Sequence, residues 1–148
     1  MTDRSYRFTH AITRRPAPSI TAGLRAVDTG APDLSLMLAH HADYVAALRG
    51  TGATVIELAA LNAFPDAVFV EDTALCLPQG AIIMRPGAAS RLGEAAEMAP
   101  YLAALYPRIA RITGADSFIE GGDILTMRMS MKGKAFKLAV MIDQEKKK

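Results

Sequence analysis

The stretch FPDAVFVED, residues 64–72, sets three carboxylates within an otherwise apolar run. Valine and phenylalanine are enriched in β-strands, so residues 67–70 are predicted to be a strand. In an ideal strand Asp66 and Asp72 share one face, and Glu71 points to the opposite face.

Carboxylates in apolar surroundings are costly to bury unless they are paired. A guanidinium is a suitable partner, because it donates several hydrogen bonds and can bind a carboxylate through two of them. The stretch is therefore interpreted as a binding site for a guanidinium-like cation. The alternative is that these acids cap turns or pair with nearby arginines, as surface acids commonly do.

The residues that precede this stretch form one predicted β-α-β unit. A strand is expected at residues 7–13, followed by a proline-containing loop, residues 14–30, with the composition of a lid. Asp33 is a plausible helix start, and residues 34–48 have helical periodicity. A strand at residues 54–58 completes the unit. The apolar face of the helix is predicted to comprise Leu34, Met37, Leu38, His41, Val45 and Leu48.

The residues that follow the acidic stretch predict a second unit of similar layout. Residues 73–77 and 81–85 are typical of a hairpin. A helix is expected over residues 94–106, with a kink or restart at Pro100, and a strand over residues 108–112. Two similar units in succession indicate a repeated α/β architecture.

A change in composition divides the chain near residue 126. Residues 1–126 contain no lysine and carry ten arginines against thirteen acids. Residues 127–148 carry six lysines and Arg128 against two acids. A third unit is predicted to begin at residues 117–125, and residues 135–142 are expected to form a strand or a helical turn. The lysine- and methionine-rich tail is interpreted as a solvated end or as a segment of different origin.

Several functional classes are not expected from this composition. The basic excess is confined to the tail, which argues against a nucleic-acid-binding surface on the body. No apolar run is long enough to span a membrane, and residues 1–10 lack the apolar core of a signal peptide. With one cysteine, Cys76, and no histidine at metal-ligand spacing, we expect a cytoplasmic protein without a metal or cofactor.

Two further residues are candidates for binding. Arg91 follows a glycine-containing loop and is suited to bind a substrate carboxylate; alternatively, it pairs on the surface with Glu94. Glu120 precedes two glycines and is suited to orient a base or to hold a cation; alternatively, it is an ordinary turn residue. Cys76 lies in an apolar strand without a neighbouring histidine, so we expect a buried, unreactive thiol.

Four segments together resemble the dimethylarginine dimethylaminohydrolase family. They are residues 14–24, 64–72, 83–91 and 119–125, and the resemblance extends over residues 7–125. It implies an α/β propeller of five ββαβ units, of which about two and a half are present here. It also implies hydrolysis of a methylated arginine to citrulline and a methylamine through a cysteine nucleophile.

The resemblance assigns substrate-contacting roles to six positions: Leu24, Asp66, Glu71, Asp72, Arg91 and Glu120. Asp66 and Asp72 would bind the guanidinium, with Glu71 beside them. Arg91 would hold the α-carboxylate, and Leu24 would lie in the lid loop. Glu120 would contact the guanidinium and orient the catalytic histidine.

The chain departs from the family pattern in one respect. The family's catalytic histidine and cysteine follow the third motif, whereas no residue after 125 is His or Cys. We therefore expect an incomplete hydrolase that is inactive alone and that can self-associate through an open propeller edge. The alternatives are a non-catalytic fragment that binds arginine-like ligands or pairs with a partner, and a fragment of an arginine deiminase or amidinotransferase.

Overall fold

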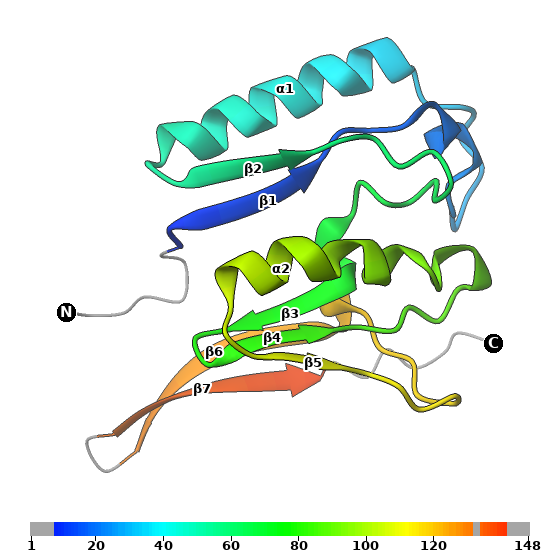
Figure 1. Ribbon diagram of the computed structural model, residues 1–148. Helices are drawn as coiled ribbons and strands as arrows, with labels where there is room; N and C mark the ends of the chain where they lie inside the picture. Colours follow the sequence, from blue (N-terminus) through cyan, green and yellow to red (C-terminus); the bar gives the residue numbers. More distant parts are fainter. Residues whose placement is uncertain (1–7, 132–133, 142–148) are drawn as a thin grey trace.

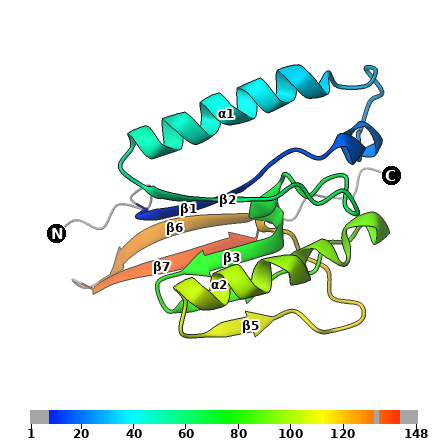
Figure 2. The same cartoon turned by 45° about the horizontal axis from the view of Figure 1, so that its top comes forward.

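The computed structural model describes residues 8–131 and 134–141. They form a mixed α/β fold with three separate sheets, two of two strands and one of three (Figures 1 and 2). Arg7, with which the first predicted strand begins, lies outside the described residues. So do residues 142–148, which contain the end of the predicted tail.

The first unit is a parallel pair of strands covered by one helix. β1 (His10–Arg14) pairs in register with β2 (Thr54–Leu58), and α1 (Leu34–Gly50) lies along them (Figure 1). The Asp33 side chain accepts a hydrogen bond from the Leu36 amide and caps the helix, as predicted. All six residues of the predicted apolar face are buried or half-buried, and every other residue of α1 is exposed.

The second unit has the predicted order of two strands, a helix and a strand. β3 (Ala74–Leu77) and β4 (Gly80–Ile83) form an antiparallel hairpin, and β5 (Ile109–Arg111) pairs parallel to β4. The predicted helix over 94–106 is two pieces, a 3-10 helix, η4 (Glu94–Met98), and α2 (Ala99–Leu105). Proline occupies the first turn of α2, where its missing amide costs nothing, so the predicted restart is confirmed.

The prediction of a strand at residues 67–70 is wrong. This segment consists of successive turns and leads into a 3-10 helix, η2 (Val70–Thr73). The amides of Ala67, Phe69 and Asp72 each donate to the carbonyl three residues earlier, at 3.0 to 3.2 Å. These local bonds replace a sheet ladder, so the predicted alternation of faces does not apply to the acids.

The third unit begins with a short 3-10 turn, η5 (Gly121–Asp123). It leads into a hairpin of β6 (Ile124–Met131) and β7 (Lys134–Met141), which are antiparallel. The segment 135–141 is therefore a strand rather than a helical turn. β6 also runs across residue 126, where the composition changes.

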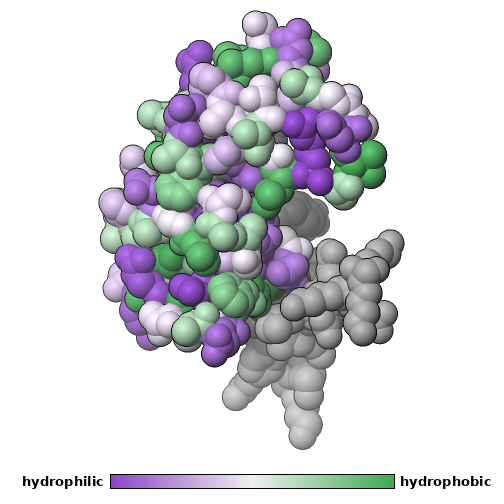
Figure 3. All heavy atoms as spheres, turned by 90° about the vertical axis from the view of Figure 1, so that its right-hand side faces the viewer, coloured by the Kyte–Doolittle hydropathy of each residue, from purple (hydrophilic) through white to green (hydrophobic). Residues whose placement is uncertain are grey.

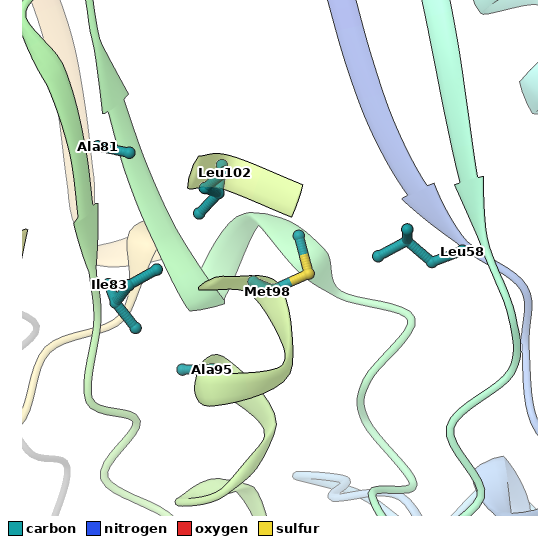
Figure 4. Close-up of a cluster of buried hydrophobic side chains, with 6 residues drawn as sticks. All are labelled: Leu58, Ala81, Ile83, Ala95, Met98 and Leu102. Carbon is teal, nitrogen blue, oxygen red and sulfur yellow. The ribbon is translucent and has the colours of Figure 1, made fainter. Parts of the chain in front are cut away.

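The core lies where η4 and α2 meet the first two sheets. Leu58 at the end of β2 points toward Met98 (Figure 4). The buried cluster comprises Leu58, Ala81, Ile83, Ala95, Met98 and Leu102. Burial of these apolar side chains joins the first unit to the second, because the cluster takes side chains from both.

No closed propeller or barrel is formed by the part of the chain that the structure describes. Within that part, no helix is long and apolar enough to cross a membrane. Figure 3 shows hydrophilic and hydrophobic residues interspersed over the described part of one face. Large exposed apolar side chains include Phe8, Leu24 and Val27.

Candidate functional site

A buried guanidinium surrounded by carboxylates forms the centre of the candidate site. Arg91 ends a 3-10 turn, η3 (Ala89–Arg91), and is 6% exposed. Its Nη1 donates to Asp72 Oδ2 at 2.9 Å, and its Nε donates to Glu94 Oε1 at 3.0 Å. Glu120 Oε2 lies 3.8 Å from Nη1. The residues of this guanidinium cluster therefore come from four segments of the chain.

Close packing of two 3-10 turns places Asp72 and Glu120 side by side. A Cβ on Gly121 would lie 1.8 Å from the Glu71 carbonyl oxygen, and one on Gly122 would lie 2.8 Å from Asp72 Oδ1. The Gly122 amide donates to that same oxygen at 3.1 Å. Glycine is thus required here by the close approach of η5 to η2 and not by an unusual backbone angle, since neither residue has a positive φ.

Glu120 is held at the start of η5 by a reciprocal cap. Its side chain accepts from the Asp123 amide, and its own amide donates to Asp123 Oδ2 at 3.2 Å. Its side chain remains 29% exposed. Glu120 is therefore fixed at its base while its carboxylate faces both Arg91 and solvent.

Asp66 and Leu24 form a second contact beside this cluster. Asp66 is 5% exposed, and both its carboxylate oxygens accept from the Leu24 amide, at 3.0 and 3.2 Å. Both residues line a cavity of about 380 Å³ beneath the loop that precedes α1. Phe69 lines the same cavity, and its carbonyl accepts from Arg91 Nη2 at 3.5 Å. Asp66 therefore holds the loop that contains Leu24 in place.

Glu71 faces away from the guanidinium cluster. It is exposed and lines a larger cavity, of about 690 Å³, together with Cys76 and Tyr106. Neither this cavity nor the smaller one is lined by Asp72, Arg91 or Glu120.

The charges of the guanidinium cluster are strongly coupled. Burial alone lowers the pKa of the Arg91 guanidinium, but hydrogen bonds to Glu94 and Asp72 outweigh this and leave that pKa above its ordinary value. Burial raises the pKa of the Glu94 carboxyl; the Arg91 bond opposes this, and the Asp66 and Asp72 charges add to it. Arg91 thus stays charged, and the effect of burial appears as the raised pKa of the Glu94 carboxyl.

The expectation that Cys76 is buried is wrong. Cys76 is exposed; it lines the larger cavity and is not part of the core cluster. Partial desolvation nevertheless raises the pKa of its thiol, and a hydrogen bond with Tyr106 opposes the rise. In the described ranges, no group of three or more His, Cys, Asp or Glu side chains is arranged to hold a metal ion.

Of the six predicted positions, the structure brings three together and separates the others. Asp72, Arg91 and Glu120 share one cluster, whereas Asp66 with Leu24 forms a neighbouring contact and Glu71 lies elsewhere. Arg91 does pair with Glu94, which was the alternative considered for it, but the pair is buried and not on the surface. Glu94 was not predicted as a site residue; its spacing three residues after Arg91 is the signal that pointed to it.

Comparison with known proteins agrees with the motifs. No family model matches the chain. The chain is 39% identical over 118 residues to the N(G),N(G)-dimethylarginine dimethylaminohydrolase of Pseudomonas aeruginosa, which covers 80% of this chain and 46% of that protein. It is 34% identical over 116 residues to the Streptomyces coelicolor protein of the same name, covering 78% and 45%.

A solved structure shares the fold as well as the sequence. The Pseudomonas aeruginosa enzyme, as a cysteine-to-serine mutant complexed with citrulline, superposes with a TM-score of 0.78 at 40% identity. The match covers 81% of this chain and 47% of that one. The chain thus spans about half the length of the relatives it matches. Over four fifths of its own length, the predicted resemblance to the dimethylarginine dimethylaminohydrolases is confirmed.

Proposed function

We propose that this chain provides the guanidinium-binding part of a dimethylarginine dimethylaminohydrolase-type site. The observation that carries this proposal is the convergence of Asp72, Glu94 and Glu120 on one buried arginine. Three carboxylates against one cation leave the cluster with excess negative charge. A second guanidinium would balance that charge through the oxygens of Asp72 and Glu120 that Arg91 leaves available.

The remaining predicted residues complete a proposed site for an arginine-like ligand. Asp66 and the Leu24 backbone would contact the ligand on the side of the proposed lid loop. Glu71 would act beside Asp72 after a local rearrangement. Arg91 would bind the ligand's α-carboxylate through donors released from Asp72. The citrulline held by the Pseudomonas aeruginosa mutant supports a ligand of this size and chemistry.

Hydrolysis would require a nucleophilic cysteine and a catalytic histidine beside the guanidinium cluster. These 148 residues supply neither at that position. In the proposed reaction a thiolate attacks the guanidinium carbon, dimethylamine leaves, and water releases citrulline. Cys76 is unsuited to this role, because partial desolvation raises the pKa of its thiol and because it lines a cavity that Arg91 does not line. We therefore propose that the chain alone binds without hydrolysing, and that a partial α/β propeller is completed by additional units.

The test is complementation. The chain would be mixed with the part of the Pseudomonas aeruginosa relative that the match does not cover, and citrulline would be measured after adding asymmetric dimethylarginine. We expect citrulline from the mixture and none from either part alone. Citrulline from this chain alone would overturn the proposed inactivity. A mixture that forms a complex yet yields no citrulline would count against the hydrolase assignment.

A second candidate function is ligand or partner binding without any catalysis. The exposed apolar side chains, among them Phe8, Leu24 and Val27, favour association with a second copy or a partner. Concentration-dependent sedimentation would reveal self-association, and a monomer at all concentrations would exclude it. We propose that either activity takes place in the cytoplasm.

A further inference from the structure

We propose that Glu94 is a positioning residue that holds Arg91 from behind and so directs Nη1 toward Asp72 and Glu120. This inference rests on the proposed function, and it deepens it by assigning a role to a residue outside the predicted six. Glu94 is not suited to contact a ligand, because it is 1% exposed.

The geometry of the pair carries the argument. A single oxygen of Glu94, Oε1, accepts from both Nε and Nη2 of Arg91. These donors lie along one edge of the planar guanidinium, so fixing them fixes its orientation. Nη1 at the opposite end then contacts Asp72 at 2.9 Å and lies 3.8 Å from Glu120.

The second oxygen of Glu94 supplies an independent observation. Oε2 is buried and has no hydrogen-bond partner among the described residues. Within the described residues, the hydrogen bonds that the Glu94 side chain accepts all come from Arg91, so Glu94 can act on the cluster only through Arg91.

The local backbone explains why Glu94 can reach Arg91. Arg91 ends η3, Glu94 begins η4, and a spacing of three residues brings side chains together on consecutive turns. η4 is itself fixed by Ala95 and Met98, which lie in the core cluster. The core therefore fixes the position of Glu94, and Glu94 in turn fixes the Arg91 guanidinium through its hydrogen bonds.

A buried arginine on the other unit offsets part of the Glu94 charge. Arg14 is 6% exposed, and the Glu94 charge is among those that counteract the lowering of its pKa by burial. Arg14 donates to the Ala59 carbonyl at 3.0 Å and contacts Met98 Sδ at 3.6 Å. The Glu94 charge thus interacts with two cations, Arg14 and Arg91, and Arg91 is the one that donates hydrogen bonds to it in the described structure.

The experiment is nuclear magnetic resonance of the arginine Nε–H groups in the full chain. The Arg91 signal would be assigned with Arg91→Lys, and hydrogen exchange would be measured in the original chain, in Glu94→Gln and in Glu97→Gln. Glu97 is the matched control, because it lies in the same 3-10 helix but is exposed. We expect a protected Arg91 Nε–H that exchanges at least about tenfold faster in Glu94→Gln and unchanged in Glu97→Gln.

A second measurement links the result to ligand binding. Glu94→Gln should weaken L-arginine binding at least about tenfold, and Glu97→Gln should leave it unchanged. Equal protection in Glu94→Gln and the original chain would overturn the inference. An unprotected Arg91 Nε–H in the original chain would also overturn it, whether or not the variant folds. A chain with protected Arg91 that binds no L-arginine would instead refute the proposed function and leave the positioning role intact.

Discussion

Burial determines how much each ion pair of this molecule contributes. The Arg49–Glu57 pair spans 3.6 Å, but its side chains are 57% and 36% exposed, so water screens most of the attraction. The Arg91 and Glu94 side chains are 7% and 1% exposed, and removal of Arg91 would leave the buried Glu94 carboxylate without its hydrogen-bonded partner. We therefore expect a single substitution in the guanidinium cluster to change stability and, under the proposed function, ligand binding as well.

The Tyr106 phenol makes one contribution to stability pH-dependent. Burial, with a further contribution from the hydrogen bond to Cys76, raises the pKa of Tyr106 from 10.0 to about 12. A group whose folded pKa is raised stabilises the fold fully below its unfolded pKa and loses that contribution as pH rises. We expect the stability difference between the original chain and Tyr106→Phe to be constant below pH 10 and to shrink between pH 10 and 12.

Urea unfolding, monitored by circular dichroism at each pH, measures the stability difference between the two proteins. For this measurement both proteins carry Cys76→Ala, because the pKa of the Cys76 thiol depends on its hydrogen bond with Tyr106; the subtraction then isolates the effect of burial on Tyr106. A difference that stays constant across the pH range from 10 to 12 would contradict the raised Tyr106 pKa.

The residues of the candidate site lie on or beside 3-10 elements, and the helices and strands form the surrounding fold. η2, η3, η4 and η5 supply Asp72, Arg91, Glu94 and the turn that Glu120 caps. Such short elements gain little from their own hydrogen bonds, so their positions depend on close mutual packing. The tightest such packing is between η5 and η2.

Gly121→Ala tests that packing. The added methyl group would lie 1.8 Å from the Glu71 carbonyl oxygen, so one of the two turns must shift. We expect a loss of about 1–3 kcal/mol in the free energy of unfolding, the usual cost of overpacking. Gly50→Ala is the control: nothing lies within 4 Å of its Cβ position, and a gain of about 0.4–1 kcal/mol is expected from the unfolded state.

Chemical denaturation of both variants gives the two free energies. Equal stability of Gly121→Ala and the original chain would mean that η5 does not pack against η2 as described.

At the level of single elements, a few neighbouring residues were sufficient to predict some strands and helix starts. The strand at 54–58 was predicted correctly because β-branched residues follow a glycine turn, and Asp33 and Pro100 marked two helix starts. The strand predicted at 67–70 does not form, because local hydrogen bonds outweigh the β-propensity of its residues. The first of these turn bonds joins the Ala67 amide to the Phe64 carbonyl. The 3-10 form of η4 had no sequence signal distinct from that of a helix.

Across the whole molecule, the candidate site depends on contacts between distant segments. Asp72 is 19 residues from Arg91 and 50 from Gly122, and no periodicity links such positions. The family resemblance assigned Asp72, Arg91 and Glu120 to one substrate site, and the structure places these three residues in one cluster. It did not predict that Glu71 faces another cavity or that Glu94 holds Arg91, because both follow from how the turns pack.

Isothermal titration with asymmetric dimethylarginine measures whether the guanidinium cluster of this chain binds a guanidinium ligand. Asp72→Asn removes a charge from the cluster, whereas Asp116→Asn removes one from an exposed loop position. We predict that the original chain and Asp116→Asn bind equally and that Asp72→Asn binds at least about tenfold more weakly. No binding by the original chain, or equal binding by Asp72→Asn, would contradict the account.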